Sequence, residues 1–275
     1  MNTRMVIRKS NEDIRFYLEN GPKFGAVLKD IETKIHHGNI TTKYQVQSEF
    51  ISACIRSFKD PEFPFCDQKN YLDEEFGYPV CVSINNTATH GMELEKDEFS
   101  KGDIVTIDCG ISVEGPTRRL FFDSAVTTVY MADVPEWVYA PRDALRNLMS
   151  IDMSSKLNTH KIATVIQNTA KEKNLPLVLS MTGHGIGYSL HEGPQIYNGT
   201  GMYSPVTLTN NTVFCIEPIF VKPEEGKGFG VAETYIDSDG WSIRTESSQP
   251  SSHFESMFCV RNGKLVDIVG ITEDS

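Results

Sequence analysis

The sequence of 275 residues has no apolar run near the roughly 20 residues that a membrane-spanning helix needs. Its first residues, MNTRMVIRKSNEDIRFYL, also lack the apolar central segment of a secretory signal peptide. We therefore expect a cytoplasmic protein that has no membrane partner.

Cysteine pairs of the kind that bind zinc or form redox motifs are missing as well. No CxxC or CxxH occurs, and the six cysteines lie far apart in the chain: Cys54, Cys66, Cys81, Cys109, Cys215 and Cys259. This spacing predicts free thiols, mostly buried, in a reducing compartment.

Positive charge is in short supply. Lysine and arginine number 26 against 37 acidic residues, which gives a net charge of −11. Such a balance argues against direct nucleic-acid binding. The acidic surplus has a simple explanation in a soluble surface, but it also fits a site built from carboxylates. The length allows one large domain or two small ones, with a sizeable core in either case.

Helical patterns occur in two pairs. Ser10 followed by Asp13 predicts a capping box, and apolar residues then recur at helical spacing until Gly38. Thr41 or Thr42 is expected to cap a second helix that ends near Phe58. Its apolar face is expected to hold Phe50, Ile51, Cys54 and Ile55. Two further helices are expected at about residues 135–153 and 159–173.

Strand patterns follow each pair of helices. VCVSIN, KGDIVTIDCGISV and RRLFFDSAVTTVYM come first, and LPLVLSMTGHGIG, TVFCIEPIF, WSIRTE and HFESMFCV come later. Helices followed by strands, twice over, predict an α+β domain with a mostly antiparallel sheet and helices on one face. The two halves are consistent with a degenerate duplication, although no sequence repeat supports it.

Four acidic residues interrupt the apolar strands: Asp108, Asp123, Glu217 and Glu255. A buried carboxylate is unfavourable unless it is paired or binds a metal. One such residue could be a hydrogen-bonded core group, but four indicate a site. With His184 they form a set of oxygen and imidazole ligands that suits divalent Mn, Fe, Co or Zn. Four carboxylates exceed the needs of one ion, so two bridged ions are expected.

The stretch TGHGIGYSLHEGP has glycines at 183, 185 and 187. A dinucleotide-binding loop would need G-x-G-x-x-G at the start of a helix, so that alternative is rejected. Small residues here would instead let the backbone approach a metal and a substrate closely.

These motifs together resemble the methionine aminopeptidases. VCVSINNTATHG, KGDIVTIDCG, FFDSAVTT, GHGIGYSLHEGP, FCIEPIF, DGWSIRT and HFESMF stand in the order typical of that family, over about residues 10–265. The resemblance implies a pita-bread fold of the type I branch, with a curved sheet, flanking helices and pseudo-twofold halves. It also implies a single catalytic domain over residues 1–275, in which residues 1–9 are a short N-terminal segment.

The resemblance assigns roles to individual residues. One metal is expected on Asp123, His184, Glu217 and Glu255, and the other on Asp108, Asp123 and Glu255. His90, His191 and Glu217 are expected to be catalytic. His90 and His191 would stabilise the tetrahedral intermediate or position the peptide, and Glu217 would pass a proton to the leaving amine. Tyr78, Cys81 and Trp241 are expected to form the methionine pocket, with Phe76 and Leu190 as further candidates.

The sequence departs from the family pattern in three places. Asp108 and Asp123 are 15 positions apart, farther than is usual in the family, which suggests a longer hairpin tip or a bulge. Glu114 is the weaker rival to Asp123 as a ligand. Ser256 replaces the histidine of many relatives, and two residues are missing between Tyr78 and Cys81.

The implied function is removal of the N-terminal methionine from nascent proteins whose next residue is small. The alternatives are a related pita-bread Xaa-Pro peptidase or amidohydrolase, and a catalytically inactive binding module. The Xaa-Pro relatives usually carry an additional N-terminal domain, for which we expect no room in 275 residues. A monomer is expected, while the physiological metal and any docking on ribosomes are left open.

Overall fold

The computed structural model describes residues 5–69, 75, 77–92, 98–153, 156–201 and 203–273. Its helices are α1 (Asn11–His36), α2 (Lys43–Ser57), α3 (Ala140–Leu148) and α4 (Thr159–Glu172), with short 3-10 turns η1 (Pro64–Asp67) and η2 (Glu136–Tyr139). Within the described residues no helix is both long enough and apolar enough to cross a membrane.

Local signals define the starts of the first two helices. The Ser10 hydroxyl accepts a hydrogen bond from the Asp13 amide at 3.0 Å, and the Asp13 carboxylate accepts one from the Ser10 amide at 3.3 Å. The predicted capping box is therefore confirmed. Thr42 caps α2 by accepting from the Gln45 amide.

Two helix predictions were partly wrong. On α2, Phe50 and Cys54 are buried as expected, but Ile55 is 60% exposed. The third helix is shorter than residues 135–153, because the chain enters through the 3-10 turn η2 and α3 ends at Leu148.

In the described part of the chain, the strands form four small sheets that are antiparallel except for one pair, β10 with β5. Their bounds are β1 (Val80–Ile84), β2 (Thr87–Thr89), β3 (Ile104–Glu114), β4 (Arg119–Val129), β5 (Leu177–Val178), β6 (Thr182–Gly185), β7 (Glu192–Tyr197), β8 (Val213–Ile216), β9 (Ile219–Val221), β10 (Val231–Ala232), β11 (Thr234–Ile236), β12 (Ile243–Thr245), β13 (Ser251–His253), β14 (Ser256–Arg261) and β15 (Lys264–Asp267). The strand orders are β1-β3-β4, β10-β5-β9-β13, β11-β12-β2 and β15-β14-β8-β6-β7.

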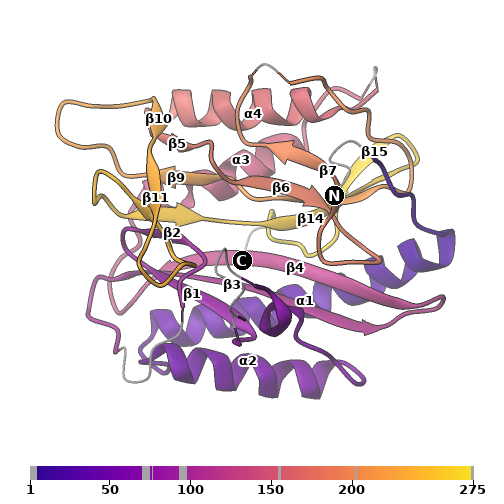
Figure 1. Cartoon of the computed structure of the whole chain (residues 1–275), viewed down its shortest axis with the longest axis horizontal. Coiled ribbons are helices and arrows are strands. Elements are labelled where there is room, and N and C mark those ends of the chain that lie inside the picture. The colour runs from indigo at the N-terminus through magenta and orange to yellow at the C-terminus, as the bar shows by residue number, and fades with distance from the viewer. Residues whose placement is uncertain are drawn as a thin grey trace.

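The helices flank these sheets on two sides. In Figure 1, α1 and α2 lie beside β3 and β4 at the bottom of the view, and α3 and α4 lie at the top, with most strands between them. Phe122 on β4 packs against the helical side: its ring lies 5.0 Å from that of Tyr17 and 6.0 Å from that of Phe24. Successive side chains of a strand point to opposite faces, so Asp123 points away from the helices and into the site.

The long hairpin β3–β4 keeps its pairing throughout. Eleven consecutive pairs run from Ile104↔Val129 to Glu114↔Arg119 without a register shift, and residues 115–118 connect the strands. The alternative of a bulge between Asp108 and Asp123 is therefore wrong, and both strands continue past the two acids toward the tip, as the longer-hairpin prediction requires. Extending both strands together lengthens the hairpin without changing the face that each side chain occupies.

The chain passes from one sheet to another at two junctions. β8 belongs to the five-stranded sheet and β9 to the four-stranded one, with Glu217 and Pro218 between them. β13 and β14 make the reverse change, with Phe254 and Glu255 between them. Because β13 pairs with β9 and β14 with β8, the two junctions face each other. We call this place the seam.

Candidate metal centre and pocket

Five separate segments bring the predicted metal ligands together. Asp108 lies on β3, Asp123 on β4 and His184 on β6, while Glu217 and Glu255 lie at the seam rather than inside strands. Pro218, which has no amide hydrogen to donate, follows Glu217 and helps to end β8 there. Glu255 is bridged to the hairpin through its backbone, because its amide donates to the Ala125 carbonyl at 2.9 Å. All five side chains line one cavity of about 320 Å³.

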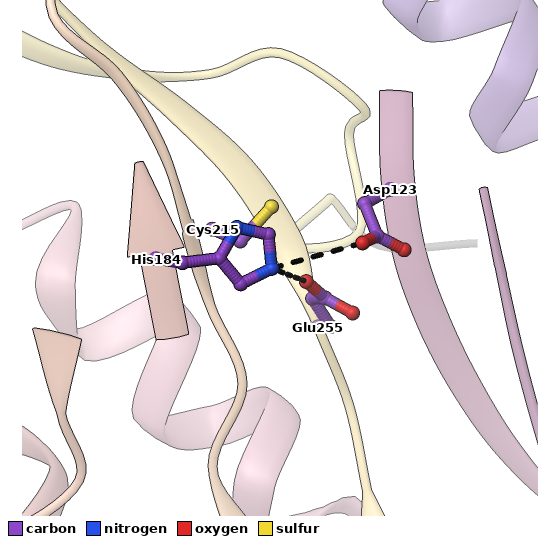
Figure 2. Close-up of side chains that lie close together, drawn as sticks. All are labelled: Asp123, His184, Cys215 and Glu255. Atoms are coloured by element: carbon purple, nitrogen blue, oxygen red, sulfur yellow. Dashed lines mark ion pairs between the residues drawn. The ribbon is translucent and has the colours of Figure 1, made fainter. Parts of the chain in front are cut away.

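His184 is the centre of the cluster (Figure 2). Its Nε2 atom lies 3.7 Å from Asp123 Oδ2 and 4.0 Å from both Glu217 Oε1 and Glu255 Oε1. The other ring nitrogen, Nδ1, is 3.0 Å from the Gly185 carbonyl. A carbonyl can only accept, so Nδ1 carries the proton and the lone pair of Nε2 points toward the carboxylates.

Three carboxylate oxygens of the cluster have no hydrogen-bond donor among the described residues. Asp108 Oδ1, Asp123 Oδ1 and Glu255 Oε1 are buried and accept no hydrogen bond from the described residues. Burial raises the pKa of each of the four acids, and neighbouring carboxylates raise those of Asp123, Glu217 and Glu255 further. Burial also lowers the pKa of His184 to about 3, so its imidazole is neutral at pH 7.

These groups fit a divalent metal. Electron pairs from four carboxyl groups and one neutral imidazole converge in a buried space, and a cation would satisfy the oxygens that have no donor. Atoms of Asp123, His184, Cys215 and Glu255 all lie within 4.8 Å of one another. The residues present therefore match what a divalent ion requires.

Cys215 was missed as part of this cluster. It is fully buried on β8, two positions before Glu217, and its sulfur lies within 4.8 Å of ligand atoms of Asp123, His184 and Glu255. The sequence held only a weak signal for it, because alternation along a strand puts residues 215 and 217 on the same side. The sequence alone places Cys215 only among the buried thiols.

Two histidines stand at the wall of the cavity. His90 follows β2 in a left-handed backbone conformation with φ of 56°. Burial, with a smaller effect from His191, lowers the pKa of His90 to about 4, so it is neutral at pH 7. The exposed His191 packs edge-on against His184, with ring centroids 4.5 Å apart.

The predicted pocket residues divide into three groups. Cys81, Trp241 and Leu190 line the cavity. Tyr78 is half-buried against the main core and is not among the described residues that line it. Phe76 lies outside the described residues. Sequence reasoning missed Phe65 on η1 and Met181 before β6, which also line the cavity and carried no motif that could have identified them.

Two further residues singled out in the sequence, Glu114 and Ser256, lie apart from the ligand cluster. The Glu114 carboxylate is 67% exposed at the far end of the hairpin, 3.8 Å from Arg119, and does not line the cavity. Ser256 points away from the cluster and donates to Asp267 Oδ1 at 2.5 Å.

Comparison with known proteins identifies the family. The model of metallopeptidase family M24 matches residues 22–257, so the chain belongs to that family. The methionine aminopeptidase of Aquifex aeolicus is 29% identical over 191 residues, which cover 67% of this chain and 69% of that protein. The expected α+β pita-bread fold is confirmed, with mostly antiparallel sheets and flanking helices.

Two solved structures share this fold to different extents. A Thermotoga maritima methionine aminopeptidase matches with a TM-score of 0.79 and 24% identity, covering 96% of this chain and 99% of its own. A prolidase from Pyrococcus horikoshii matches with a TM-score of 0.66 and 15% identity, covering 97% of this chain and 64% of its own. The superposition is better with the aminopeptidase.

Proposed function

We propose that this chain is a metal-dependent methionine aminopeptidase, which removes the N-terminal methionine from peptides and proteins whose second residue is small. The observation that carries the proposal is the convergence of four acids and His184 in one cavity, next to the apolar side chains of Cys81, Leu190 and Trp241. The curated relative from Aquifex aeolicus bears the name of the same activity. The Xaa-Pro peptidase and inactive-module alternatives have no comparable support.

Two divalent ions are proposed for this site. Asp123, His184, Glu217 and Glu255 would hold one ion, while Asp108, Asp123 and Glu255 would hold the other. Such ions would act as Lewis acids that polarise the scissile carbonyl and make water a better nucleophile near neutral pH. Cobalt, manganese, iron and zinc all suit this donor set.

The residues of the chain supply the remaining steps. Glu217 would accept the proton of the attacking water and pass it to the leaving amine. His90 and His191, as neutral imidazoles, would donate hydrogen bonds to the substrate carbonyl oxygen as negative charge develops on it. The free amine of the substrate would lie near Asp108, which explains a requirement for an unblocked N-terminus.

The apolar walls determine the preferred side chain. Cys81, Leu190 and Trp241 present soft, apolar surface that suits an unbranched thioether. An apolar pocket discriminates between similar side chains by about 10–200-fold, so methionine should exceed leucine at the first position by that range. The second side chain would face the crowded rim, so it must be small.

A matched peptide set tests this function. Met-Ala-Ser and Met-Gly peptides should be cleaved, whereas Met-Leu, Met-Lys and N-acetylated Met-Ala peptides should stay intact, with products read by mass spectrometry. Release of residues ahead of proline, with Met-Ala untouched, would support the Xaa-Pro alternative. A metal-loaded protein that cleaves none of them would be a binding module.

The cellular setting follows from the same proposal. We place the enzyme in the cytoplasm as a monomer whose catalytic core spans about residues 10–265, and nascent chains at the ribosome are its proposed substrates. Light scattering of the purified protein tests the oligomeric state. Cosedimentation with ribosomes, before and after a salt wash, tests the docking.

A further inference from the structure

The residues just before α1 reach the wall of the active site. Lys9 Nζ lies 2.5 Å from Glu192 Oε2, and the two side chains are 0% and 4% exposed. Glu192 directly follows His191, and residues 186–191 form the loop that carries Leu190 and His191 to the cavity. The ion pair therefore joins residues 183 positions apart in the sequence.

Glu192 uses its second oxygen to hold the loop. Its Oε1 accepts hydrogen bonds from the amides of Tyr188 at 2.6 Å and Ser189 at 3.1 Å. One carboxylate thus fixes both the turn of the loop and, through the adjacent peptide, the position of His191. Hydrogen bonds that backbone amides donate to a charged acceptor are stronger than those they donate to a neutral acceptor.

Lys9 is itself fixed. Its amide donates to the Asn211 carbonyl at 2.8 Å, and its Nζ also donates to the Ile7 carbonyl at 3.1 Å. The loop leaves room for its side chain only because residue 187 is glycine: a Cβ there would lie 1.8 Å from Lys9 Cε. A contact this close shows that the loop backbone is fitted around the lysine.

We propose that Lys9 and Glu192 form a buried clamp that positions His191, and that residues 7–9 therefore belong to the support of the active site. The proposal rests on the proposed function for the role of His191, but the clamp itself can be tested without turnover. Lys9 does not line the cavity, and Glu192, which does line it, is proposed to act by holding His191, so we treat both as positioning residues.

The experiment must separate positioning from folding. Removing one partner would leave a buried charge unpaired and could unfold the protein. The useful variant is the neutral pair Lys9→Met with Glu192→Gln, which keeps the shape and leaves an amide oxygen for the Tyr188 and Ser189 amides. The matched control is Lys34→Met with Glu49→Gln, which removes a solvent-accessible pair of 2.8 Å between α1 and α2.

The clamp predicts a specific pattern. The Lys9/Glu192 double variant should fold and bind metal as the wild type does, but lose about 100-fold in kcat/KM, as expected when a reacting group is misplaced by about 1 Å. Adding His191→Ala to it should lower activity no further than His191→Ala alone, because both act through the same group. The Lys34/Glu49 control should keep wild-type activity.

Two outcomes would overturn the clamp. Wild-type kcat/KM in the folded Lys9/Glu192 variant would show that the ion pair only stabilises the fold. If its loss in kcat/KM adds fully to the loss caused by His191→Ala, the pair does not act through His191. If the wild type cleaves no peptide, hydrogen exchange still decides. Amides 188 and 189 should exchange faster in the Lys9/Glu192 variant than in the control, and unchanged exchange would reject the clamp even then.

Discussion

Asp108 and Asp123 are diagonal neighbours on one face of the β3–β4 hairpin. Asp123 lies opposite Gly110, which is two positions along β3 from Asp108. Because side chains two positions apart share a face, the two carboxylates point to the same side although 15 positions separate them in the chain. Gly110 has no side chain, which leaves room for the Phe65 ring, because a Cβ at residue 110 would lie only 2.9 Å from Phe65 Cε1.

Removal of metal should abolish activity. A strong chelator is expected to reduce hydrolysis of Met-Ala-Ser to background, because the buried carboxylates cannot activate water without a cation. Adding Mn²⁺, Co²⁺ or Fe²⁺ should restore it. Activity and metal content, measured on the same samples, check this. Full activity in a preparation without metal would contradict the proposed centre.

Glu217→Ala should lower kcat by several orders of magnitude, since one substitution removes both a ligand and a proton acceptor. The fold should persist, because Glu217 lies at the seam outside the main apolar cluster. Steady-state kinetics and circular dichroism measure the two effects. Glu224→Ala, at a surface acid paired with Lys227, is the matched control. Retention of a tenth of wild-type activity would identify Glu217 as a structural acid.

His191→Ala should keep the metal and lose turnover. Its ring contacts that of His184, but the proposed ligand set does not include it. Metal analysis of the purified variant, followed by kinetics, separates the two roles. Loss of bound metal would mean that the roles of His184 and His191 have been exchanged.

Gly110→Ala should weaken binding of methionine peptides. A Cβ at this position would lie 2.9 Å from Phe65 Cε1 and 3.4 Å from Leu190 Cδ1, and both side chains line the cavity. Their displacement should narrow the pocket and raise KM more than it lowers kcat. Gly230→Ala, where the nearest atom is 4.0 Å away, is the control. Unchanged KM in Gly110→Ala would place the methionine side chain elsewhere.

Asp13 should make stability depend on pH. Burial opposes ionisation, but hydrogen bonds from Ser10, Thr117 and Tyr188 outweigh it and lower the pKa of Asp13. The folded protein therefore binds fewer protons at this group than the unfolded chain, whose value is about 3.9. The stabilisation is complete above the unfolded pKa and is lost as pH falls through the lower folded pKa.

Asp13→Asn measures that contribution. Urea unfolding should show the variant to be less stable by about 1–3 kcal/mol at pH 6, the range for hydrogen bonds to a charged group. The difference should shrink as pH falls below about 4, where the unfolded chain begins to bind a proton at Asp13, and it should be lost once pH falls through the lower folded pKa. A constant difference from pH 6 to pH 3 would show that ionisation of Asp13 contributes nothing.

Several features could be predicted from the sequence because short-range interactions determine them. Ser10 and Asp13 cap α1 through contacts within one turn. The apolar strands around Asp108 and Asp123 pair as neighbours in the chain, so their hairpin follows from alternation and a short turn. Four acids within apolar strands also predicted a metal site, because burying an unpaired carboxylate is strongly unfavourable.

Only the tertiary structure decided how those residues meet. Glu217 and Glu255 lie where strands change sheets, and no local pattern says which two changes will face each other. Cys215 lies in the cluster, whereas Tyr78 does not line the cavity. Both placements depend on packing between segments that are distant in the sequence. Lys9 pairs with Glu192 for the same reason: a buried charge needs a partner, and folding alone determines which one it finds.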